Sequence, residues 1–205
     1  MTDKTKPFGE TAGNDTSGLI LTQLTTQRAR DAAELETIAN AYDKYIFKNQ
    51  NKAKGSDWLT DKFIRHLHKD MFGEIWNWAG KFRTHNVNIG IDWSQITEQI
   101  QVLCGDFQYW NSSKSSMPPI ETAARLQNRL TRIHPFNNGN GRHARFVTDI
   151  FLNSIHHTIP KWPQIQLKSE GHEIREQYIG AMKKADHDDY DDLIEFIKDC
   201  ISEEA

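Results

Sequence analysis

Apolar residues recur at intervals of three and four along most of this chain, and this helical spacing limits its fold more than any other feature. The pattern is clearest over residues 59–72 and 96–110, and in residues 28–47 the apolar stripe includes Leu35 and Ile38. Amphipathic helices bury their apolar faces against one another. We therefore predict an all-α bundle. The predicted helices are Arg28–Phe47, Leu59–Phe72, Ile96–Trp110, Pro119–Ile133, Asn140–Leu152, Glu173–Lys184 and Asp191–Ser202.

One stretch departs from this spacing, between Trp76 and Ile91. Glycine, asparagine and β-branched residues alternate there, as is typical of short strands and turns. Phe82–Thr84 and Val87–Ile89 are predicted to pair as a small β-hairpin around His85 and Asn86. Because an isolated two-stranded hairpin is only marginally stable in water, we expect this one to rest on the helices.

The chain has 205 residues, which suits one domain with a single sizeable core. Residues 1–18 are polar and rich in Gly, Thr and Asp, so we expect a flexible N-terminal arm there and a single domain over residues 19–205. Apolar runs are shorter than the roughly 18–20 residues that span a bilayer, and the start lacks the apolar segment of a secretory signal. We expect a cytoplasmic protein without membrane contacts. The net charge of −3 does not favour general nucleic-acid binding.

The sequence I-H-P-F-N-N-G-N-G-R-H-A-R, residues 133–145, lies between two predicted helices. Its glycines let the backbone approach a ligand closely, and the first N–H groups of a helix lack partners within the helix, which favours phosphate. Arg142 and Arg145 share a helix face and can bind a polyphosphate through forked, charge-assisted hydrogen bonds. Salt bridges to a neighbouring helix are an equally open interpretation of these arginines.

His134 stands at the end of the preceding helix, because the residue before a proline is pushed out of the α region. A histidine titrates near neutrality, so it can take a proton from an attacking hydroxyl. A single histidine is more often structural, but the predicted phosphate site a few residues away favours a general base. Phe136 is expected to be a buried anchor, and Arg125 and Arg129 to belong to a solvated helix face.

The segment H-P-F-N-N-G-N-G-R-H-A-R resembles the motif of the Fic/Doc family, HPF-x-(D/E)-GNGR-x-x-R, at every defining position but one. W-A-G-K-F-R-T, residues 78–84, is similar to the approach to that family's flap, and residues 178–186 are similar to its C-terminal helices. The resemblance covers about residues 59–201. It is strongest to the branch labelled mobile mystery protein B. It implies a Fic-type (filamentation induced by cAMP) helical bundle with a small β-hairpin flap.

This resemblance implies a protein adenylyltransferase, which moves a nucleoside monophosphate, usually AMP from ATP, to a Ser, Thr or Tyr hydroxyl of a target protein. His134 would be the general base. Arg142 and Arg145 would be catalytic by neutralising charge on the leaving pyrophosphate. The residues implied to bind the nucleotide are Asn138, Gly139, Asn140, Gly141, Arg142 and Arg145.

The resemblance also implies that the flap, Lys81–Ile91, aligns an extended segment of the target by strand addition. The flap residues expected to contact the target are Lys81, Thr84, Asn86, Val87 and Asn88. Tyr178 and His143 are further candidates for lining the nucleotide pocket.

Asn138 is the departure from the family motif, since the family usually has Asp or Glu there to hold Mg²⁺. An amide oxygen carries no charge, so we expect weak Mg²⁺ binding or a metal held mainly by the nucleotide's phosphates. Another nucleoside triphosphate, or a different phosphate-containing donor, is therefore an open alternative to ATP. A Fic scaffold that binds a nucleotide or a partner without catalysis is another, although a pure binder does not need His134.

Many relatives carry an inhibitory helix with the pattern (S/T)-x-x-x-E-(G/N). Glu34 is followed by Leu35, and Glu170 has Gln166 where Ser or Thr is required, so neither fits. We therefore expect either a separate antitoxin-like inhibitor, as in bacterial toxin–antitoxin pairs, or no control of this kind.

A histidine-based metal hydrolase is the third interpretation. The adjacent residues His156 and His157 would point to different helix faces. The acidic run of residues 185–192 lacks the pattern of a calcium loop and is predicted to be a solvated turn. His66 and His68 do not share a helical face and are expected at the surface.

Overall fold

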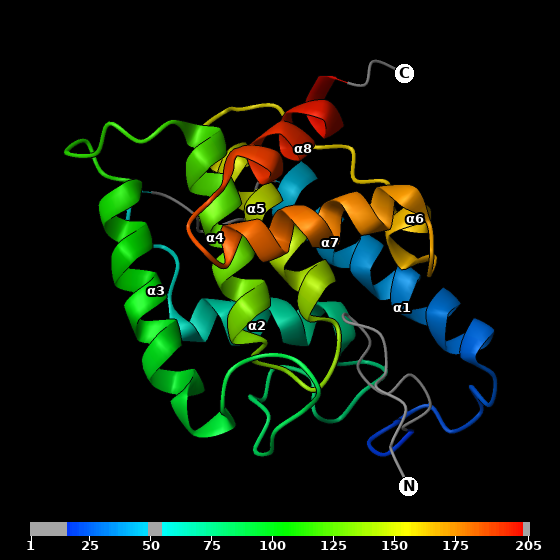
Figure 1. Cartoon of the computed structure of the whole chain (residues 1–205). Helices are drawn as coiled ribbons and strands as arrows, with labels where there is room; N and C mark the ends of the chain where they lie inside the picture. Colours follow the sequence, from blue (N-terminus) through cyan, green and yellow to red (C-terminus); the bar gives the residue numbers. More distant parts are fainter. Residues whose placement is uncertain (1–15, 49–54, 203–205) are drawn as a thin grey trace, which may run out of the picture.

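The computed structural model describes residues 16–48 and 55–202, which form a bundle of helices (Figure 1). The α-helices are α1 (Gln27–Tyr42), α2 (Asp61–Phe72), α3 (Ile96–Trp110), α4 (Pro119–Ile133), α5 (Asn140–Ser154), α6 (Gln164–Lys168), α7 (Glu173–Ala185) and α8 (Asp191–Ser202). A π-helical turn, η1 (Asp43–Phe47), continues α1, and a 3₁₀ turn, η2 (Trp93–Gln95), precedes α3. The predicted all-α bundle is confirmed.

The helix boundaries follow local chemistry. The Thr60 hydroxyl accepts a hydrogen bond from the Phe63 N–H at the start of α2, and Pro119 occupies the first position of α4. His134 ends α4 with a left-handed backbone. The seven predicted helices are all present, whereas the five-residue helix α6 was not predicted because it is too short to show a period.

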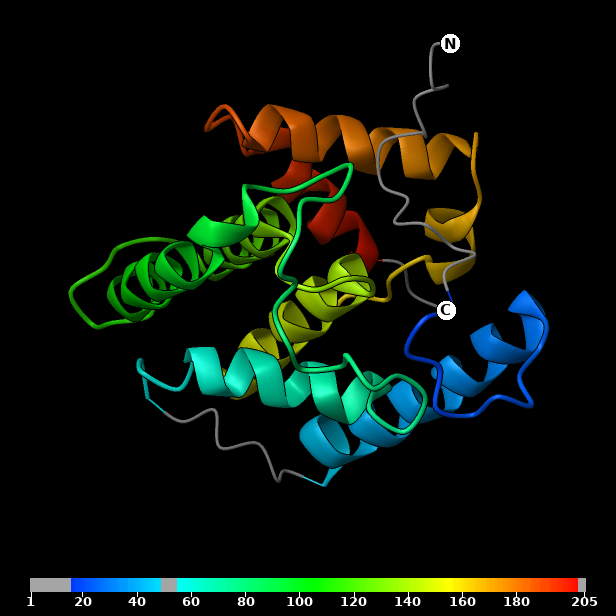
Figure 2. The same ribbon diagram turned by 90° about the horizontal axis from the view of Figure 1, so that it is seen from below.

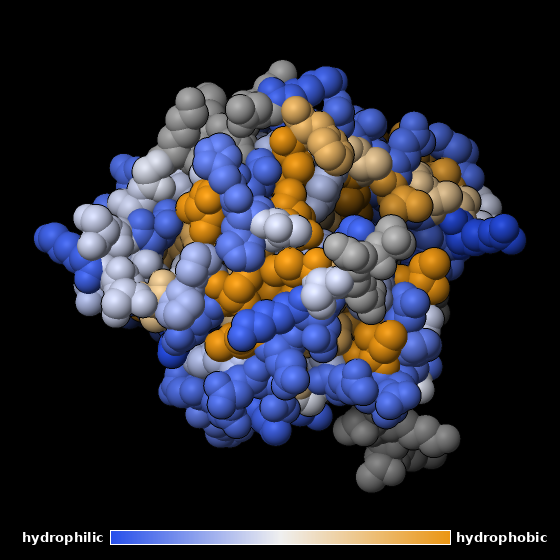
Figure 3. Space-filling view, turned by 90° about the horizontal axis from the view of Figure 1, so that it is seen from above, coloured by the Kyte–Doolittle hydropathy of each residue, from blue (hydrophilic) through white to orange (hydrophobic). Residues whose placement is uncertain are grey.

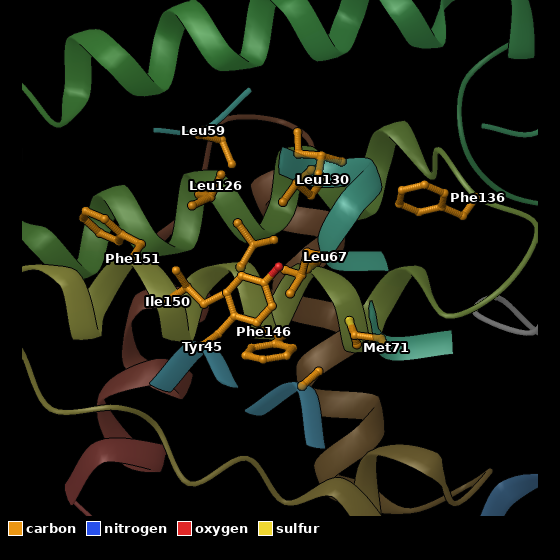
Figure 4. Close-up of a cluster of buried hydrophobic side chains, with 14 of the residues drawn as sticks. Tyr45, Leu59, Leu67, Met71, Leu126, Leu130, Phe136, Phe146, Ile150 and Phe151 are labelled. Atoms are coloured by element: carbon orange, nitrogen blue, oxygen red, sulfur yellow. The ribbon is translucent and has the colours of Figure 1, made fainter. Parts of the chain in front are cut away.

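Helix α4 organises the core, because it packs against α3, α5, α7 and α8. Its Leu126 and Leu130 belong to the larger buried cluster, which includes Leu67 and Met71 of α2 (Figure 4). Its Ala124 belongs to a smaller cluster with α7 and α8. Both clusters therefore meet along α4, which ends at His134.

The buried side of α1 carries several polar residues among its apolar ones. Arg30, Glu34 and Thr37 are buried, whereas Leu35 is 69% exposed, so its placement in an apolar stripe was wrong. The Thr37 hydroxyl donates to the Met71 carbonyl at 2.7 Å, and hydrogen bonds of this kind satisfy the polar face.

The predicted β-hairpin of Phe82–Thr84 and Val87–Ile89 is wrong. The described residues contain one isolated β-bridge, between Leu19 and Trp76, and no paired strands. The backbone of this segment is bonded by side chains instead: the Arg83 guanidinium binds carbonyls of the segment, and the Asn86 side chain accepts from the Trp93 N–H. Lys81–Ile91 is thus an irregular loop, which we continue to call the flap.

Residues 1–15 of the predicted N-terminal arm lie outside the described residues. Gly18, the last residue of the predicted arm (residues 1–18), is attached to the bundle, because its carbonyl accepts a hydrogen bond from the Asn77 N–H at 2.8 Å. On the face seen in Figure 3, apolar groups form separate patches among hydrophilic ones. Within residues 16–48 and 55–202, none of the helices is long and apolar enough to cross a membrane.

Candidate active site

The motif loop, residues 134–139, joins α4 to α5 at the lower end of the bundle in Figure 1, and Figure 2 views that end directly. His134 (φ 53°) and Gly139 (φ 78°) both have left-handed backbones. A Cβ at position 139 would lie 2.7 Å from two ring carbons of Phe72. Both backbone conformation and packing therefore require glycine at the start of α5.

Asn140 and Phe136 hold the motif loop closed. The Asn140 Oδ1 accepts from the Phe136 N–H at 2.9 Å, and its Nδ2 donates to the Phe136 carbonyl at 2.8 Å. Both residues are buried, as expected for Phe136. In this structure the Asn140 side chain supports the loop, so a phosphate would meet residue 140 through its backbone N–H.

The start of α5 offers donors to an anion. The N–H groups of residues 140–142 lie in the first turn, where a helix provides no partner, and the helix dipole adds positive potential. The Gly139 N–H is bonded to the Asn138 Oδ1 at 2.7 Å. The geometry suits a phosphate group held by backbone donors.

Arg142 carries one positive charge at this site. Its guanidinium lies over the Phe72 ring, 4.8 Å from the centroid, and forms a salt bridge with Glu34 of α1. The Glu34 carboxylate also accepts from Trp76 Nε1 at 2.7 Å and is buried. Glu34 does not fit the inhibitory pattern (S/T)-x-x-x-E-(G/N), because Leu35 follows it in sequence. The fold nevertheless pairs the Glu34 carboxylate with Arg142 of the motif.

Arg145 lies deeper and has different contacts. Its Nη2 donates to Gln164 Oε1 at 3.0 Å, and its guanidinium is 5.9 Å from the centroid of the Tyr178 ring. Its Nε is buried without a partner among the described residues. Arg142 and Arg145 are therefore at the same end of α5, but each is engaged by a different element.

Asp149, one turn beyond Arg145, joins three segments. It accepts from the Tyr42 hydroxyl at 2.6 Å and from Trp162 Nε1 at 2.8 Å. Burial raises the pKa of Asp149 to about 7, although these hydrogen bonds and the charge of Arg145 oppose the shift. This carboxyl group fixes the segment that carries Gln164, the partner of Arg145.

His134 is buried beside the flap, and neither of its ring nitrogens has a well-formed hydrogen bond in the described part of the chain. Burial lowers the pKa of His134 to about 4, and the charge of Arg83 adds to this shift, while the nearby Thr131 carbonyl opposes it. The imidazole is therefore neutral at pH 7 and keeps a lone pair for a proton. This is the state that a general base requires.

Arg83 is a buried residue that the sequence analysis missed. Its side chain donates to the carbonyls of His134 at 2.8 Å and His85 at 2.9 Å, and also to those of Ile91 and Ile133. The sequence W-A-G-K-F-R-T does not show that its arginine is buried. Arg83 is buried because it binds carbonyls at the C-terminal end of α4, about 50 residues further along the chain.

His68 is also buried, so its expected surface position was wrong. The Gly80 N–H donates to its Nδ1 at 3.0 Å, which places the proton on Nε2, where it donates to the Asn138 carbonyl at 3.0 Å. The ring stacks on Phe136, and burial holds the pKa of His68 well below its usual value. His68 thus connects the start of the flap to the motif loop.

Of the two other pocket candidates, His143 faces the core. Its Nε2 contacts the Ile64 carbonyl at 3.0 Å, and burial lowers its pKa to about 4. Tyr178 lies near Arg145, and its hydroxyl accepts from Gln127 Nε2 at 2.9 Å. The structure therefore keeps Tyr178 near the site and assigns His143 to packing.

The flap covers His134. A Cβ at Gly90 would lie 2.5 Å from the His134 Cβ, so the two chains are in close contact there. The residues expected to contact a target are mostly at the surface: Lys81, Thr84, Asn86 and Asn88 are exposed and Val87 is half-buried. Side chains that could meet a target therefore lie on the outside of the loop that covers the base.

The residues around the motif do not form a metal site of their own. Asn138 contributes a neutral oxygen that already accepts from Gly139, and residues 16–48 and 55–202 contain no cluster of three or more His, Cys, Asp or Glu side chains suited to a metal. This donor set does not suit Mg²⁺, which prefers anionic oxygens. The histidines and acidic residues of the metal-hydrolase interpretation form no such cluster in this part of the chain either.

Arg125 and Arg129 were expected on a solvated helix face, but both are half-buried and belong to ion pairs. Arg125 binds Glu121 within α4, and Arg129 binds Asp106 of α3 at 3.1 Å. These two arginines are thus engaged within the bundle, and Arg142 and Arg145 remain the motif arginines next to the start of α5.

Comparisons with known proteins show what this chain is similar to. The model of the Fic/DOC family matches residues 58–152. A curated relative, the protein adenylyltransferase Fic of Aedes aegypti, is 28% identical over 160 residues, which cover 77% of this chain and 30% of the relative. The protein adenylyltransferase Fic of Drosophila mojavensis is 31% identical over 146 residues, which cover 70% of this chain and 28% of that relative. The chain thus spans less than a third of the length of these relatives.

Solved structures share the fold. Fic-1 (residues 134–508) of C. elegans aligns with a TM-score of 0.67 at 20% identity, covering 83% of this chain and 48% of that one. The N-terminal Fic domain of Bep8 from Bartonella sp. 1-1C aligns with a TM-score of 0.64 at 14% identity, covering 89% of each chain. A Fic domain from Bartonella quintana with bound ADP aligns with a TM-score of 0.59 at 17% identity, covering 85% and 86%.

Proposed function

We propose that this chain, which has the Fic fold, is a protein adenylyltransferase-like enzyme that moves a nucleoside monophosphate from a nucleoside triphosphate to a hydroxyl side chain of a target protein. The donor is ATP by analogy with the curated relatives, whose names state the activity. The observation that carries the proposal is the position of His134: a neutral, buried imidazole without a firm hydrogen bond, at the end of α4 and the start of the loop that leads into α5.

The chemistry follows from this position. The hydroxyl oxygen of the target attacks the α-phosphorus, and the new O–P bond forms as the bond from that phosphorus to the oxygen bridging to the β-phosphate breaks. Pyrophosphate leaves, and the hydroxyl proton passes to a ring nitrogen of His134. Buried positive charge and backbone donors that need not rearrange stabilise the charge that develops on the phosphates.

The donors for those phosphates are the first-turn N–H groups of α5, residues 140–142, with Arg142 and Arg145. Glu34 opposes this role, because its carboxylate occupies the Arg142 guanidinium in this structure. A phosphate and a carboxylate compete for the same donors. The chain therefore binds its nucleotide productively once Glu34 has released Arg142.

Mg²⁺ has a limited place in the proposal. The protein supplies the neutral Asn138 in place of an acidic ligand, so a divalent ion would be held mainly by the phosphates of the nucleotide. Such an ion would neutralise phosphate charge when bound.

Two further parts of the proposal rest on the sequence resemblance: the mobile mystery protein B branch and a separate antitoxin-like inhibitor, as in bacterial toxin–antitoxin pairs. A cytoplasmic location is proposed because the apolar runs of the chain are short. The modified residue would be a Ser, Thr or Tyr of the target, presented by Lys81, Thr84, Asn86, Val87 and Asn88. The W-A-G-K-F-R-T and H-P-F-N-N-G-N-G-R-H-A-R segments support the branch.

The test is intact mass spectrometry of the purified protein after incubation with Mg²⁺ or Mn²⁺ and each of the four ribonucleoside triphosphates, in buffer and in cell lysate. A parallel reaction compares label on the α-phosphate with label on the γ-phosphate. Incorporation of the α-label alone, lost in His134→Ala, is the expected result. Binding of a triphosphate without α-label incorporation, even in Glu34→Gln, would favour a nucleotide-binding protein without catalysis. If none of the four triphosphates binds, the donor is a different phosphate compound.

A further inference from the structure

We propose that Arg83 is a positioning residue that acts through His134: its guanidinium fastens the flap to the end of α4, over the base. This inference rests on the proposed function, because it assigns a role relative to His134. Arg83 is 2% exposed, and the four acceptors recorded for its side chain are all backbone carbonyls.

Two of these carbonyls, of Ile133 and His134, lie at the C-terminal end of α4. The last carbonyls of a helix lack partners within it and carry the negative end of the helix dipole. A buried guanidinium satisfies them and is itself stabilised there. Arg83 therefore supports the left-handed backbone that His134 adopts at the end of α4.

The other two carbonyls, of His85 and Ile91, lie on either side of the tip of the flap. One side chain thus closes this loop, which has no strand pairing to do so. Gly90, next to Ile91, is the point where the flap touches His134, and a Cβ there would also lie 3.0 Å from Arg83 Nη2. A target segment on the flap is therefore placed relative to the base by Arg83.

The charge of Arg83 has a separate effect. A cation beside an imidazole disfavours its protonation. Among the described residues, Arg83 is the charged side chain that lowers the pKa of His134, and the Asp92 carboxylate acts on Arg83 in turn by favouring its charged form. The Thr131 carbonyl acts on His134 in the opposite direction. Loss of the Arg83 charge should move the pKa of His134 upwards.

The primary experiment follows the pKa of His134 by NMR with labelled histidine, and it needs no catalytic activity. His134→Ala identifies the signal. The unmodified chain is compared with two variants. Arg83→Gln removes the charge and some of the hydrogen bonds of the guanidinium. Arg83→Lys keeps the charge but loses the forked hydrogen bonds of the guanidinium. Arg65→Gln is the matched control, since Arg65 packs over the flap ring of Phe82 at 3.5 Å and pairs with Asp61.

We expect the His134 pKa to rise in Arg83→Gln, to stay near that of the unmodified chain in Arg83→Lys, and to be unchanged in Arg65→Gln. An unchanged pKa in folded Arg83→Gln would overturn the assignment of the charge. If Arg83→Gln does not fold, Arg83→Lys still tests the hydrogen bonds of the guanidinium. Limited proteolysis should cleave the flap, Lys81–Ile91, faster in Arg83→Lys than in the unmodified chain. An unchanged cleavage rate would overturn the fastening role.

Activity gives the second readout. In a chain that modifies a target, both Arg83 variants should lower kcat by about 100-fold, as misplacement of a reacting group does, while the Kd for the triphosphate changes little. An equal loss of nucleotide binding would indicate general damage to the fold and overturn the positioning role. If the unmodified chain transfers nothing, the proposed function fails, whereas the titration and proteolysis results still stand.

Discussion

The carboxylate of Glu34 in α1 is paired with the guanidinium of Arg142 in α5, although 108 residues separate them in sequence. The same carboxylate accepts from Trp76 Nε1, so it is held from two sides. A negative group therefore lies where the proposed function needs an anionic phosphate. Whether the arginine binds its own chain or a nucleotide is a competition that substitutions can shift.

Glu34→Gln should strengthen nucleotide binding. The amide oxygen can still accept from Trp76, but it lacks the charge that competes for Arg142. Charge-assisted hydrogen bonds contribute about 1.5–3 kcal/mol, so we expect the Kd for the triphosphate to fall by roughly tenfold or more. Isothermal titration calorimetry measures it. Glu36→Gln, an exposed change on the same helix, is the control and should leave the Kd unchanged.

Transfer activity should be insensitive to pH across neutrality and fall in acid. The pKa of His134 is lowered to about 4, so the unprotonated base is fully present above about pH 5 and is lost as the pH falls through 4. The measurement is the initial rate of label transfer from pH 4 to pH 8, corrected for unfolding. A midpoint near 6.5, the ordinary value for histidine, would contradict the buried state of His134.

Asp149→Asn should make stability depend more steeply on pH. The folded-state pKa of Asp149 is raised to about 7, so its contribution to stability is lost as the pH rises from about 4 to 7. His134 and His143 have lowered pKa values, about 4, and their contributions are full above about 6.5 and lost as the pH falls towards 4. The two effects oppose each other.

Removal of the carboxyl group abolishes the first effect, so it no longer offsets the histidine effect. The unfolding free energy of Asp149→Asn should rise with pH by about 1.4 kcal/mol per unit more than that of the unmodified chain, between pH 4.5 and 6. Urea unfolding at several pH values measures this slope. Equal slopes in the two proteins would mean that Asp149 is ionised throughout the range.

Gly90→Ala should separate the flap from the base. The new Cβ would lie 2.5 Å from the His134 Cβ, and the backbone at φ 99° is unfavourable for alanine. We expect target modification to fall by at least tenfold with little change in nucleotide affinity. Gly105→Ala is the control, because a Cβ there meets nothing within 4 Å. Full activity in Gly90→Ala would show that contact between flap and base is dispensable.

The sequence was sufficient for the helices but not for the contacts between them. Proline at 119 and the His134–Pro135 pair fixed the ends of α4, because they act through local backbone sterics. The burial of His68 and Arg83 could not be predicted, since their partners are backbone groups of distant segments. The flap alternates like a strand, but bonds from Arg83 and Asn86 replaced the expected pairing.

The site shows the same division. His134, Arg142 and Arg145 could be proposed as site residues from a short segment, because a loop followed by the first turns of one helix brings them to one end of the bundle. Asn140 belongs to the same segment and was predicted to bind the nucleotide. Its side chain instead forms hydrogen bonds with the Phe136 N–H and carbonyl, because these buried backbone groups need partners. Glu34 comes from another helix, and its pairing with Arg142 appears only once α1 is packed.

The close approach of Gly139 to Phe72 makes these two positions a coupled pair in any combinatorial library. A leucine at position 72 would give space to a side chain at 139, yet the left-handed backbone at 139 would still select glycine. Randomising both positions and selecting for folded protein should therefore return glycine at 139 with several large apolar residues at 72, because position 72 is buried. The glycine persists on backbone grounds alone, and Phe72 is the freer member of the pair.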